Sequence, residues 1–255
     1  MSITIKDLNF SYGKIPVLRD INLQVLEGKF TVLLGKNGSG KSTLLKLLAG
    51  LLPYKSGQIE VSGTDLRQLT ISERAKLIGY LPQFHTPAFP FTVEEVVLTG
   101  RASYIITVPK RKDITKTDEV IEKVGINHLR HRSYTDLSGG ERQLVMIARV
   151  LAQEPKIILL DEPLSHLDLS NQARLLSLIK ELLLSGLTVM AVLHDPNTAF
   201  MNADDFILIK NGAIRNLYGD EKPWDASILM DLYEVQIEAL PFRNKALIIP
   251  AFENK

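Results

Sequence analysis

A short loop, GKNGSGKST at residues 35–43, combines glycines, a lysine and hydroxyl side chains in the order Gly-x-x-x-x-Gly-Lys-Ser. Glycine leaves the backbone N–H groups of such a loop free to turn toward phosphate oxygens, Lys41 can reach terminal phosphates, and the Ser42 hydroxyl can bind Mg²⁺. The loop follows the apolar run FTVLL and precedes the helix-like segment STLLKLLAG, so the pattern predicts a nucleotide site. The residues expected to surround the phosphates are Gly35, Lys36, Asn37, Gly38, Ser39, Gly40, Lys41, Ser42 and Thr43.

Two adjacent carboxylates end the apolar segment IILLDE at residues 157–162. If this segment is a buried strand of a parallel sheet, Asp161 and Glu162 emerge at the edge where ligands of open α/β sheets bind. Asp161 is then placed to hold Mg²⁺ through water, and Glu162 to accept a proton from the water that attacks a γ-phosphate. The simpler alternative is a strand that ends in solvated acids, and the phosphate-binding loop upstream favours catalysis.

Two further polar side chains follow apolar runs. His194 ends TVMAVLHD and should emerge at the same sheet edge, beside the γ-phosphate, although a single histidine is more often structural. Gln83 closes YLPQ, where its amide can meet Mg²⁺ or the attacking water. No role is assigned to the other histidines, His85, His128, His131 and His166.

The segment LSGGERQ places Ser138 and two glycines, Gly139 and Gly140, at the start of an apolar-periodic helix. Two glycines in a first helical turn cost about 1 kcal/mol each relative to alanine. Ser138 followed three residues later by Glu141 is a capping box, which is often no more than a helix start. The alternative is that the uncovered N–H groups bind an anion. On its own this segment leaves both interpretations open.

Composition narrows the class of protein. The chain has 255 residues, enough for one folding unit with an inserted lobe, and a formal net charge of +1 from 30 basic and 29 acidic residues. This balance gives no reason to expect nucleic-acid binding or a polybasic membrane tether. The absence of cysteine excludes disulfides, thiolate metal sites and cysteine nucleophiles. We expect neither a signal peptide nor a membrane span, since MSITIKDLNF lacks the basic-then-apolar order and the longest apolar stretch, 182–193, is interrupted.

The pattern of apolar residues predicts the elements that position these side chains. ITIKDLNF, INLQV and QIEVSG alternate like half-exposed antiparallel strands, whereas FTVLL, PKIILLDE, LTVMAVLHD and DFILIKNG resemble buried strands. An amphipathic helix, LSNQARLLSLIKELLL, separates two of the buried strands, which predicts an α/β fold with a mostly parallel sheet. Residues 84–153 are expected to form a helical lobe. In it, Thr92 and Glu95 start a helix that should end at Gly100, and TKTDEVIEKVG should end at Gly125.

In this order and spacing, the phosphate loop, Gln83, LSGGERQ, IILLDE, SHLD and His194 resemble the ATP-hydrolysing subunit of ATP-binding cassette (ABC) transporters over nearly the whole chain. The resemblance implies a P-loop NTPase fold with a mostly parallel central sheet, an antiparallel β subdomain and an inserted helical subdomain. It also implies that Tyr12 in FSYG stacks on adenine, with an ordinary strand aromatic as the alternative. The expected divisions are 1–83 and 154–219 for the nucleotide-binding core, 84–153 for the helical subdomain and 220–255 for the tail.

The same resemblance implies how LSGG is used. Two subunits pair head to tail, and Ser138, Gly139 and Gly140 of one close over the ATP and Mg²⁺ held by the other. The loop 165–168, which includes Asp168, communicates between the subunits. Because each motif occurs once, we expect the second cassette to come from another chain, as a homodimer or, less simply, a heterodimer. On this interpretation the capping box and the anion site are compatible.

A cassette without membrane spans is similar to those of bacterial importers. The resemblance implies docking on separate integral membrane permease subunits at the cytoplasmic face of the inner membrane, and indirect cooperation with a periplasmic or lipid-anchored substrate-binding protein. The helical lobe, hinged near Gln83, would pass ATP-driven motion to the permease. Segments 79–101 and 228–240 most resemble cassettes that serve iron–siderophore, haem, cobalamin or related metal-chelate importers. Cassettes for free zinc or manganese are the close alternative.

Two other classes share these motifs. The soluble iron–sulfur cluster assembly ATPase is similar in size, but the ERQ after LSGG and the importer-like tail argue against it. A non-catalytic binding module would be expected to lose Lys41, Glu162 or His194, and all three are present.

The chain departs from the family pattern in a few places. Leu164 stands where a small polar residue is usual, and His166 where alanine is common. Residues 103–113 fit the family's helical lobe least well. The tail after Gly219 is too short for the extra regulatory domain of some importer cassettes, so we expect no substrate-sensing site on this subunit.

Overall fold

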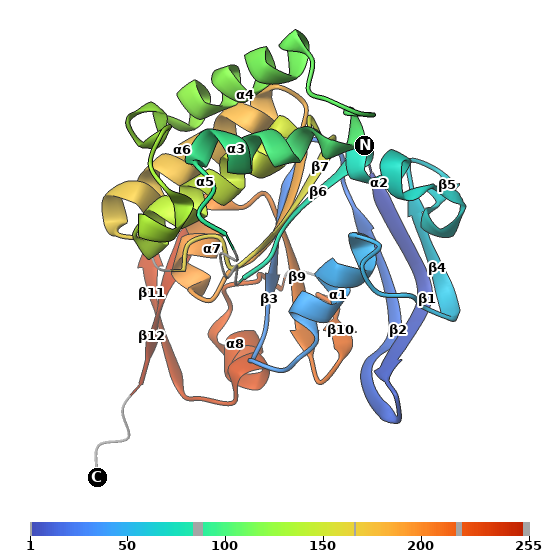
Figure 1. The fold of residues 1–255 in the computed structure, drawn as a ribbon. Helices are drawn as coiled ribbons and strands as arrows, with labels where there is room; N and C mark the ends of the chain where they lie inside the picture. Colours follow the sequence, from blue (N-terminus) through green and yellow to red (C-terminus); the bar gives the residue numbers. More distant parts are fainter. Residues whose placement is uncertain (1, 84–88, 166, 218–220, 252–255) are drawn as a thin grey trace.

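The computed structural model describes residues 2–83, 89–165, 167–217 and 221–251 (Figure 1). Its centre is a six-stranded sheet in the order β10-β9-β3-β8-β7-β6. Adjacent strands in it run parallel except at one edge, where β10 pairs antiparallel with β9. The strands are β3 (Phe30–Leu34), β6 (Ile78–Leu81), β7 (Ile157–Asp161), β8 (Thr188–Val192), β9 (Asp205–Lys210) and β10 (Ala213–Arg215). The expected α/β fold with a mostly parallel sheet is confirmed.

Helices cover both faces of this sheet. They are α1 (Lys41–Leu48), α2 (Ile71–Leu77), α3 (Val93–Leu98), α4 (Arg111–Val124), α5 (Gly139–Ala152), α6 (Leu169–Leu184), α7 (Pro196–Asn202) and α8 (Ala226–Tyr233). The described residues also form 3₁₀ turns at Leu66–Gln68, Thr99–Ser103, Asn127–Leu129 and Tyr134–Asp136.

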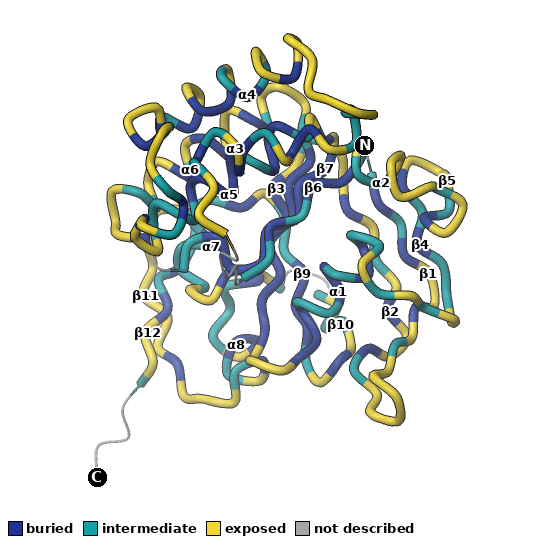
Figure 2. Tube along the Cα trace, viewed as in Figure 1, coloured by how far each residue is buried: buried dark blue, intermediate teal, exposed yellow. Residues whose placement is uncertain are grey.

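Alternate side chains of the central strands fill two hydrophobic cores, one on each face of the sheet. On β7, Ile158 and Leu160 belong to a core shared with α3 to α8. Ile157 and Leu159 belong to a second core shared with α1 and the antiparallel sheet. A strand buried on both faces needs apolar residues at every position, which explains the continuous apolar runs. Figure 2 shows these central strands among the most buried parts of the chain.

A second, antiparallel sheet lies beside the first, in the order β2-β1-β4-β5. Its strands β1 and β2 mix buried and exposed residues, as a sheet with one solvated face requires, and register shifts interrupt a regular alternation. Its buried face supplies Ile3, Ile5 and Leu8 to the core that contains α1. The strands are β1 (Ile3–Tyr12), β2 (Ile15–Val25), β4 (Ser56–Val61) and β5 (Thr64–Asp65).

The helical lobe differs from expectation in two details. Thr92 and Glu95 form the expected capping box of α3, but this helix ends at Leu98 instead of Gly100. Gly100 lies in the following 3₁₀ turn, where an added Cβ would stand 2.1 Å from the carbonyl oxygen of Arg149, so glycine is needed there for close packing. Helix α4 ends before Gly125 as expected but begins earlier, at Arg111, within the segment that fits the family pattern least well.

The C-terminal segment forms helix α8 and a hairpin of β11 (Ile237–Phe242) and β12 (Lys245–Pro250), neither of which we expected from the sequence. The hairpin is tied to α7, because the side-chain amide of Asn197 donates to the carbonyl oxygen of Ile248 and accepts from its N–H, at 3.0 and 2.7 Å. Helix α8 is tied to the phosphate loop by an ion pair of 2.6 Å between Glu234 and Lys36.

Candidate nucleotide-binding site

The loop between β3 and α1 has a backbone that only glycine allows at two positions. Gly35 (φ 153°) and Gly40 (φ 104°) have positive φ. A Cβ on Gly35 would lie 2.2 Å from the carbonyl oxygen of Ile209, and one on Gly40 would lie 2.6 Å from Leu18 Cδ2. Inside the loop, the Ser39 hydroxyl is buried and has no hydrogen-bond partner among the described residues. A tight glycine loop with an unpaired hydroxyl at a helix N-terminus fits an anionic ligand.

Lys41 is buried at the centre of this loop. Its Nζ donates to the carbonyl oxygens of Gly35 and Lys36 at 2.7 and 2.8 Å. Burial lowers the pKa of Lys41, and the nearby carboxylates of Glu162 and Asp161 act in the opposite direction. The ammonium group is thus partly desolvated and held by neutral acceptors, so a phosphate offers it a stronger partner.

Asp161 and Ser42 meet across the floor of the site. The Ser42 hydroxyl donates to Asp161 Oδ1 at 2.9 Å, and the Tyr80 hydroxyl lies 3.4 Å from Oδ2. Burial raises the pKa of Asp161, and burial together with the Asp161 charge raises the pKa of Tyr80. No cluster of three metal-ligating side chains occurs in the described ranges. A pair of oxygen ligands beside a phosphate loop is nevertheless what Mg²⁺ needs, since it takes most of its ligands from water and phosphate.

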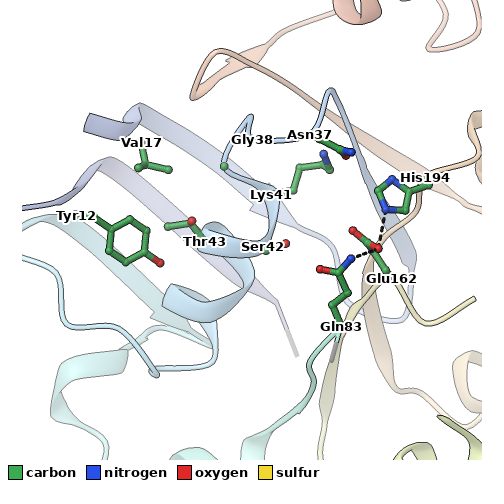
Figure 3. A pocket seen from close by; sticks show the side chains of 11 residues that line it. Tyr12, Val17, Asn37, Gly38, Lys41, Ser42, Thr43, Gln83, Glu162 and His194 are labelled. Atoms are coloured by element: carbon green, nitrogen blue, oxygen red, sulfur yellow. Dashed lines mark hydrogen bonds and ion pairs between the residues drawn. The ribbon is translucent and has the colours of Figure 1, made fainter. Parts of the chain in front are cut away.

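Glu162 is the meeting point of the remaining side chains. It follows β7 with a left-handed backbone (φ 55°) and is buried. Its Oε2 lies 2.6 Å from His194 Nε2, accepts a short hydrogen bond from the amide of Gln83, and lies 3.4 Å from the Ser165 hydroxyl (Figure 3). Residues from the segments that follow β6, β7 and β8 therefore meet at one carboxylate oxygen.

These side chains surround a cavity of 390 Å³. Tyr12 stands at one end, 46% exposed, and Glu162 with His194 at the other, with the phosphate loop between them (Figure 3). The lining consists of Tyr12, Val17, Asn37, Gly38, Gly40, Lys41, Ser42, Thr43, Gln83, Glu162 and His194. Such an elongated cavity, with an exposed aromatic at one end and anion-binding groups at the other, suits a nucleotide.

Two residues of this region were not predicted as site residues from the sequence. Val17 on β2 lines the cavity between Tyr12 and the loop. The sequence feature that could have predicted it is the strand that pairs with the strand of Tyr12. Tyr80 contacts Asp161. The sequence feature that could have predicted this contact is a hydroxyl side chain near the end of an otherwise apolar run.

The expected contributors from LSGG do not line this cavity. Ser138 caps α5, accepting from the Glu141 N–H at 3.2 Å, while Glu141 accepts from the Ser138 N–H at 2.8 Å, so the capping box is confirmed. Gly139 and Gly140 follow in the first turn, where backbone N–H groups have no intrahelical acceptor. Asp168 is exposed and caps α6 through the Asn171 N–H at 2.8 Å.

The other histidines lie outside the site. His131 contacts Glu94 at 3.3 Å, and His128 does not line the cavity. His85 and His166 fall outside the described residues. The helices of the described part of the chain include none that is long and apolar enough to cross a membrane.

The fold and the site together define a P-loop α/β protein with a nucleotide-binding cavity. A family model for ABC transporters matches residues 18–165. The chain is 36% identical over 252 residues to a probable iron chelatin transport ATP-binding protein of Helicobacter pylori, covering 97% of this chain and 99% of that protein. It is 40% identical over 230 residues to the hemin import ATP-binding protein HmuV of Aliivibrio fischeri, covering 89% and 86%.

Solved structures agree with these relatives. A chain from an inward-facing transporter described as of the metal-chelate type aligns with a TM-score of 0.83 and 31% identity, covering 99% of this chain and 98% of the other. An ATP-binding cassette in its ADP conformation aligns with a TM-score of 0.75 and 27% identity, covering 84% and 90%. The chain belongs to the ABC transporter family, in which it is an ATP-hydrolysing, nucleotide-binding subunit that works with membrane permeases.

Proposed function

We propose that this chain powers the import of a metal chelate, such as an iron–siderophore complex or haem, by hydrolysing Mg-ATP between two copies of itself. The observation that carries the catalytic part is the convergence of His194 and Gln83 on Glu162, next to the Ser42–Asp161 pair. A metal chelate as the cargo is supported by the names of the relatives, which refer to iron-chelatin transport and hemin import, and by a structural neighbour of the metal-chelate type.

Glu162 is the general base in this proposal. Its Oε2 is the atom that would take the proton from the attacking water, and in the present arrangement it is held by His194 and Gln83. When a γ-phosphate enters, His194 would turn its Nε2 toward a phosphate oxygen, and Gln83 would move its amide to the metal or the water. Glu162 Oε2 is then free to accept a proton. Lys41 would exchange its two carbonyl acceptors for β- and γ-phosphate oxygens.

The Mg²⁺ ion belongs beside Ser42 and Asp161. Bound there, Mg²⁺ would neutralise charge that builds up on the β- and γ-phosphates. Ser42 would supply its hydroxyl oxygen and Asp161 its buried carboxylate. Gln83, whose amide nitrogen now donates to Glu162, would add its amide oxygen. The raised pKa of Asp161 fits this role, since a buried carboxylate without a full counter-charge favours a cation.

A second copy of the chain completes each site in this proposal. Ser138, Gly139 and Gly140 lie outside the cavity of their own chain, and the capping box uses the Ser138 and Glu141 side chains while leaving first-turn N–H groups uncovered. These groups would meet the γ-phosphate held by the partner's loop, with the exposed Asp168 at the same interface. The head-to-tail homodimer explains two glycines that would otherwise weaken α5.

Tyr12 would stack on adenine at the far end of the cavity. Its ring is half exposed, lines the cavity and packs edge-on against Phe10, with 4.9 Å between the ring centroids. The working location would be the cytoplasmic face of the inner membrane, with a periplasmic or lipid-anchored binding protein delivering the chelate to the permease. A zinc or manganese importer is the alternative within the same architecture.

Purification of the tagged chain from its own cells tests this function. We expect multispanning membrane subunits to accompany it, and ATP hydrolysis by the assembly to rise when a binding protein loaded with iron chelate or haem is added. Recovery of soluble iron–sulfur scaffold proteins in place of membrane subunits would support the assembly ATPase. Stimulation by a zinc- or manganese-loaded binding protein would identify the cargo as free metal ions instead of a chelate.

A further inference from the structure

The C-terminal end of α8 lies against the first two residues of the phosphate loop (Figure 1). Glu234, the residue that ends this helix, forms an ion pair of 2.6 Å with Lys36. The hydroxyl of the preceding residue, Tyr233, is buried and lies near the N–H of Gly35, although it makes no hydrogen bond of ordinary geometry among the described residues. Two successive residues of the helix therefore face two successive residues of the loop, with Glu234 and Lys36 198 positions apart in sequence.

Helix α8 is held in place by its own packing. Ile228, Leu229 and Leu232 are buried in the core that is shared with α3 to α7. Asp231 forms a second ion pair, of 2.5 Å, with Lys210 on β9. The contacts with the phosphate loop are thus made from an element whose position is fixed independently of the loop.

Lys36 links this helix to the centre of the loop. Its side chain extends to Glu234 and does not line the nucleotide cavity. Its carbonyl oxygen accepts from the Ser39 N–H at 3.2 Å and from Lys41 Nζ at 2.8 Å. A partner that fixes the Lys36 side chain therefore also restricts the carbonyl oxygen that positions the Lys41 ammonium group.

The surroundings of Glu234 favour the pair with Lys36. The hydrogen bond from Lys36, together with its charge, holds the pKa of Glu234 below its usual value, so the carboxylate stays ionised. The C-terminal end of a helix carries a partial negative charge, which adds to the attraction for the ammonium group. The backbone of Glu234 is left-handed (φ 55°), and glycine is the common residue at such a helix end. What glutamate contributes at this position is therefore its side chain.

We propose that Glu234 is a positioning residue for nucleotide binding, which holds Lys36, and through the Lys36 carbonyl the Lys41 ammonium group, in the arrangement that receives the phosphates. This inference rests on the part of the proposed function that places phosphates at Lys41, and it does not depend on the cargo. The loop contacts phosphates in the ground state and in the transition state alike. Loss of the pair should therefore weaken nucleotide binding and leave the chemical step unchanged.

Variants of the purified chain test the proposal. E234G removes the carboxylate and gives the left-handed position to the residue that prefers it, so the fold should keep its stability. K36M removes the other partner, a double variant removes both, and K36R keeps the charge. The matched control is D231N, which breaks an ion pair between the same helix and Lys210, a residue outside the loop.

The dissociation constants for ADP and ATP should rise about two- to fivefold in E234G, in K36M and in the double variant alike, because each change removes the same exposed contact. KM for ATP should rise by the same factor, with kcat within about twofold of the wild-type value. K36R and D231N should bind nucleotide like the wild type, and the Tm of E234G should stay within about 3 °C of the wild-type Tm. The effect of E234G should shrink between about 50 and 500 mM NaCl, since salt screens an exposed pair.

Three results would overturn the proposal. Tighter binding by E234G with weaker binding by K36M would show that the two charges act on the phosphates directly, because removal of a carboxylate then favours the anion. Unchanged affinity of E234G would exclude any role of the pair in binding. Equal weakening by D231N would make Glu234 only a general support of α8. If the wild-type chain binds no nucleotide, the proposed function fails first, whereas wild-type affinity of E234G defeats this inference alone.

Discussion

Glu162 Oε2 lies 2.6 Å from His194 Nε2, and the amide of Gln83 donates to the same oxygen. The atom proposed to take a proton from water is therefore already occupied. If Glu162 is the base, a γ-phosphate would have to draw His194 away before the carboxylate could act. On the proposed mechanism we expect hydrolysis by the isolated chain to be slow, because the base must first lose two hydrogen-bonding partners.

Replacing Glu162 by glutamine should stop turnover and keep nucleotide binding. Glutamine preserves the size of the side chain but cannot take the proton, so kcat should fall about 10² to 10⁴-fold. ATP should then hold two copies together, and the ATP-dependent dimer should be visible by size-exclusion chromatography. The matched control is H131A, which alters an exposed histidine paired with Glu94. Turnover of E162Q at the wild-type rate would remove Glu162 from the role of base.

The raised pKa of Asp161 predicts how the stability of the ligand-free protein depends on pH. Burial raises its pKa, so its contribution to folding is fully present below the unfolded-state pKa and is lost as the pH rises through the higher folded-state pKa. D161N removes this loss. In urea denaturation, the free energy of unfolding of the ligand-free variant should increase relative to that of the wild type as the pH rises above about 4.

The same variant should lose the stabilisation that Mg-ATP confers on the wild-type chain. The second measurement is the shift of Tm with nucleotide, with and without Mg²⁺. Equal pH slopes for D161N and wild type would contradict the buried charge, and an unchanged Mg²⁺-dependent Tm shift would contradict the metal role.

Substitutions of Ser138 should distinguish nucleotide binding by a single chain from ATP-driven dimerisation of two chains. S138R places a long cation over the start of α5, so it should abolish ATP-driven dimerisation on the E162Q background. Nucleotide affinity of the single chain should stay within about twofold, because Ser138 does not line its own cavity. S138T, which keeps the capping hydroxyl, should dimerise normally. Loss of nucleotide binding by monomeric S138R would argue against a composite site.

The sequence predicted those features that follow from local order and spacing. The phosphate loop could be predicted because Gly35 and Gly40 are required by a tight turn around an anion, and the capping box of α5 because Ser138 and Glu141 are three residues apart. The parallel sheet followed from continuous apolar runs such as IILLDE separated by a helix. The position of Gly100 could not be predicted, because its need for glycine comes from the backbone of Arg149, which is distant in sequence.

The sequence by itself determines which residues can do chemistry. They are a lysine after glycines, two carboxylates at the end of a strand, and a histidine after the next strand. Only the tertiary structure decides that Gln83 and His194 share one oxygen of Glu162, and that the Tyr80 hydroxyl lies 3.4 Å from Asp161. It also decides that the buried Arg101 pairs with Asp113 and Glu154. The physical reason is that spacing along the chain governs turns, caps and strands, whereas contacts between distant segments depend on how two cores pack against one sheet.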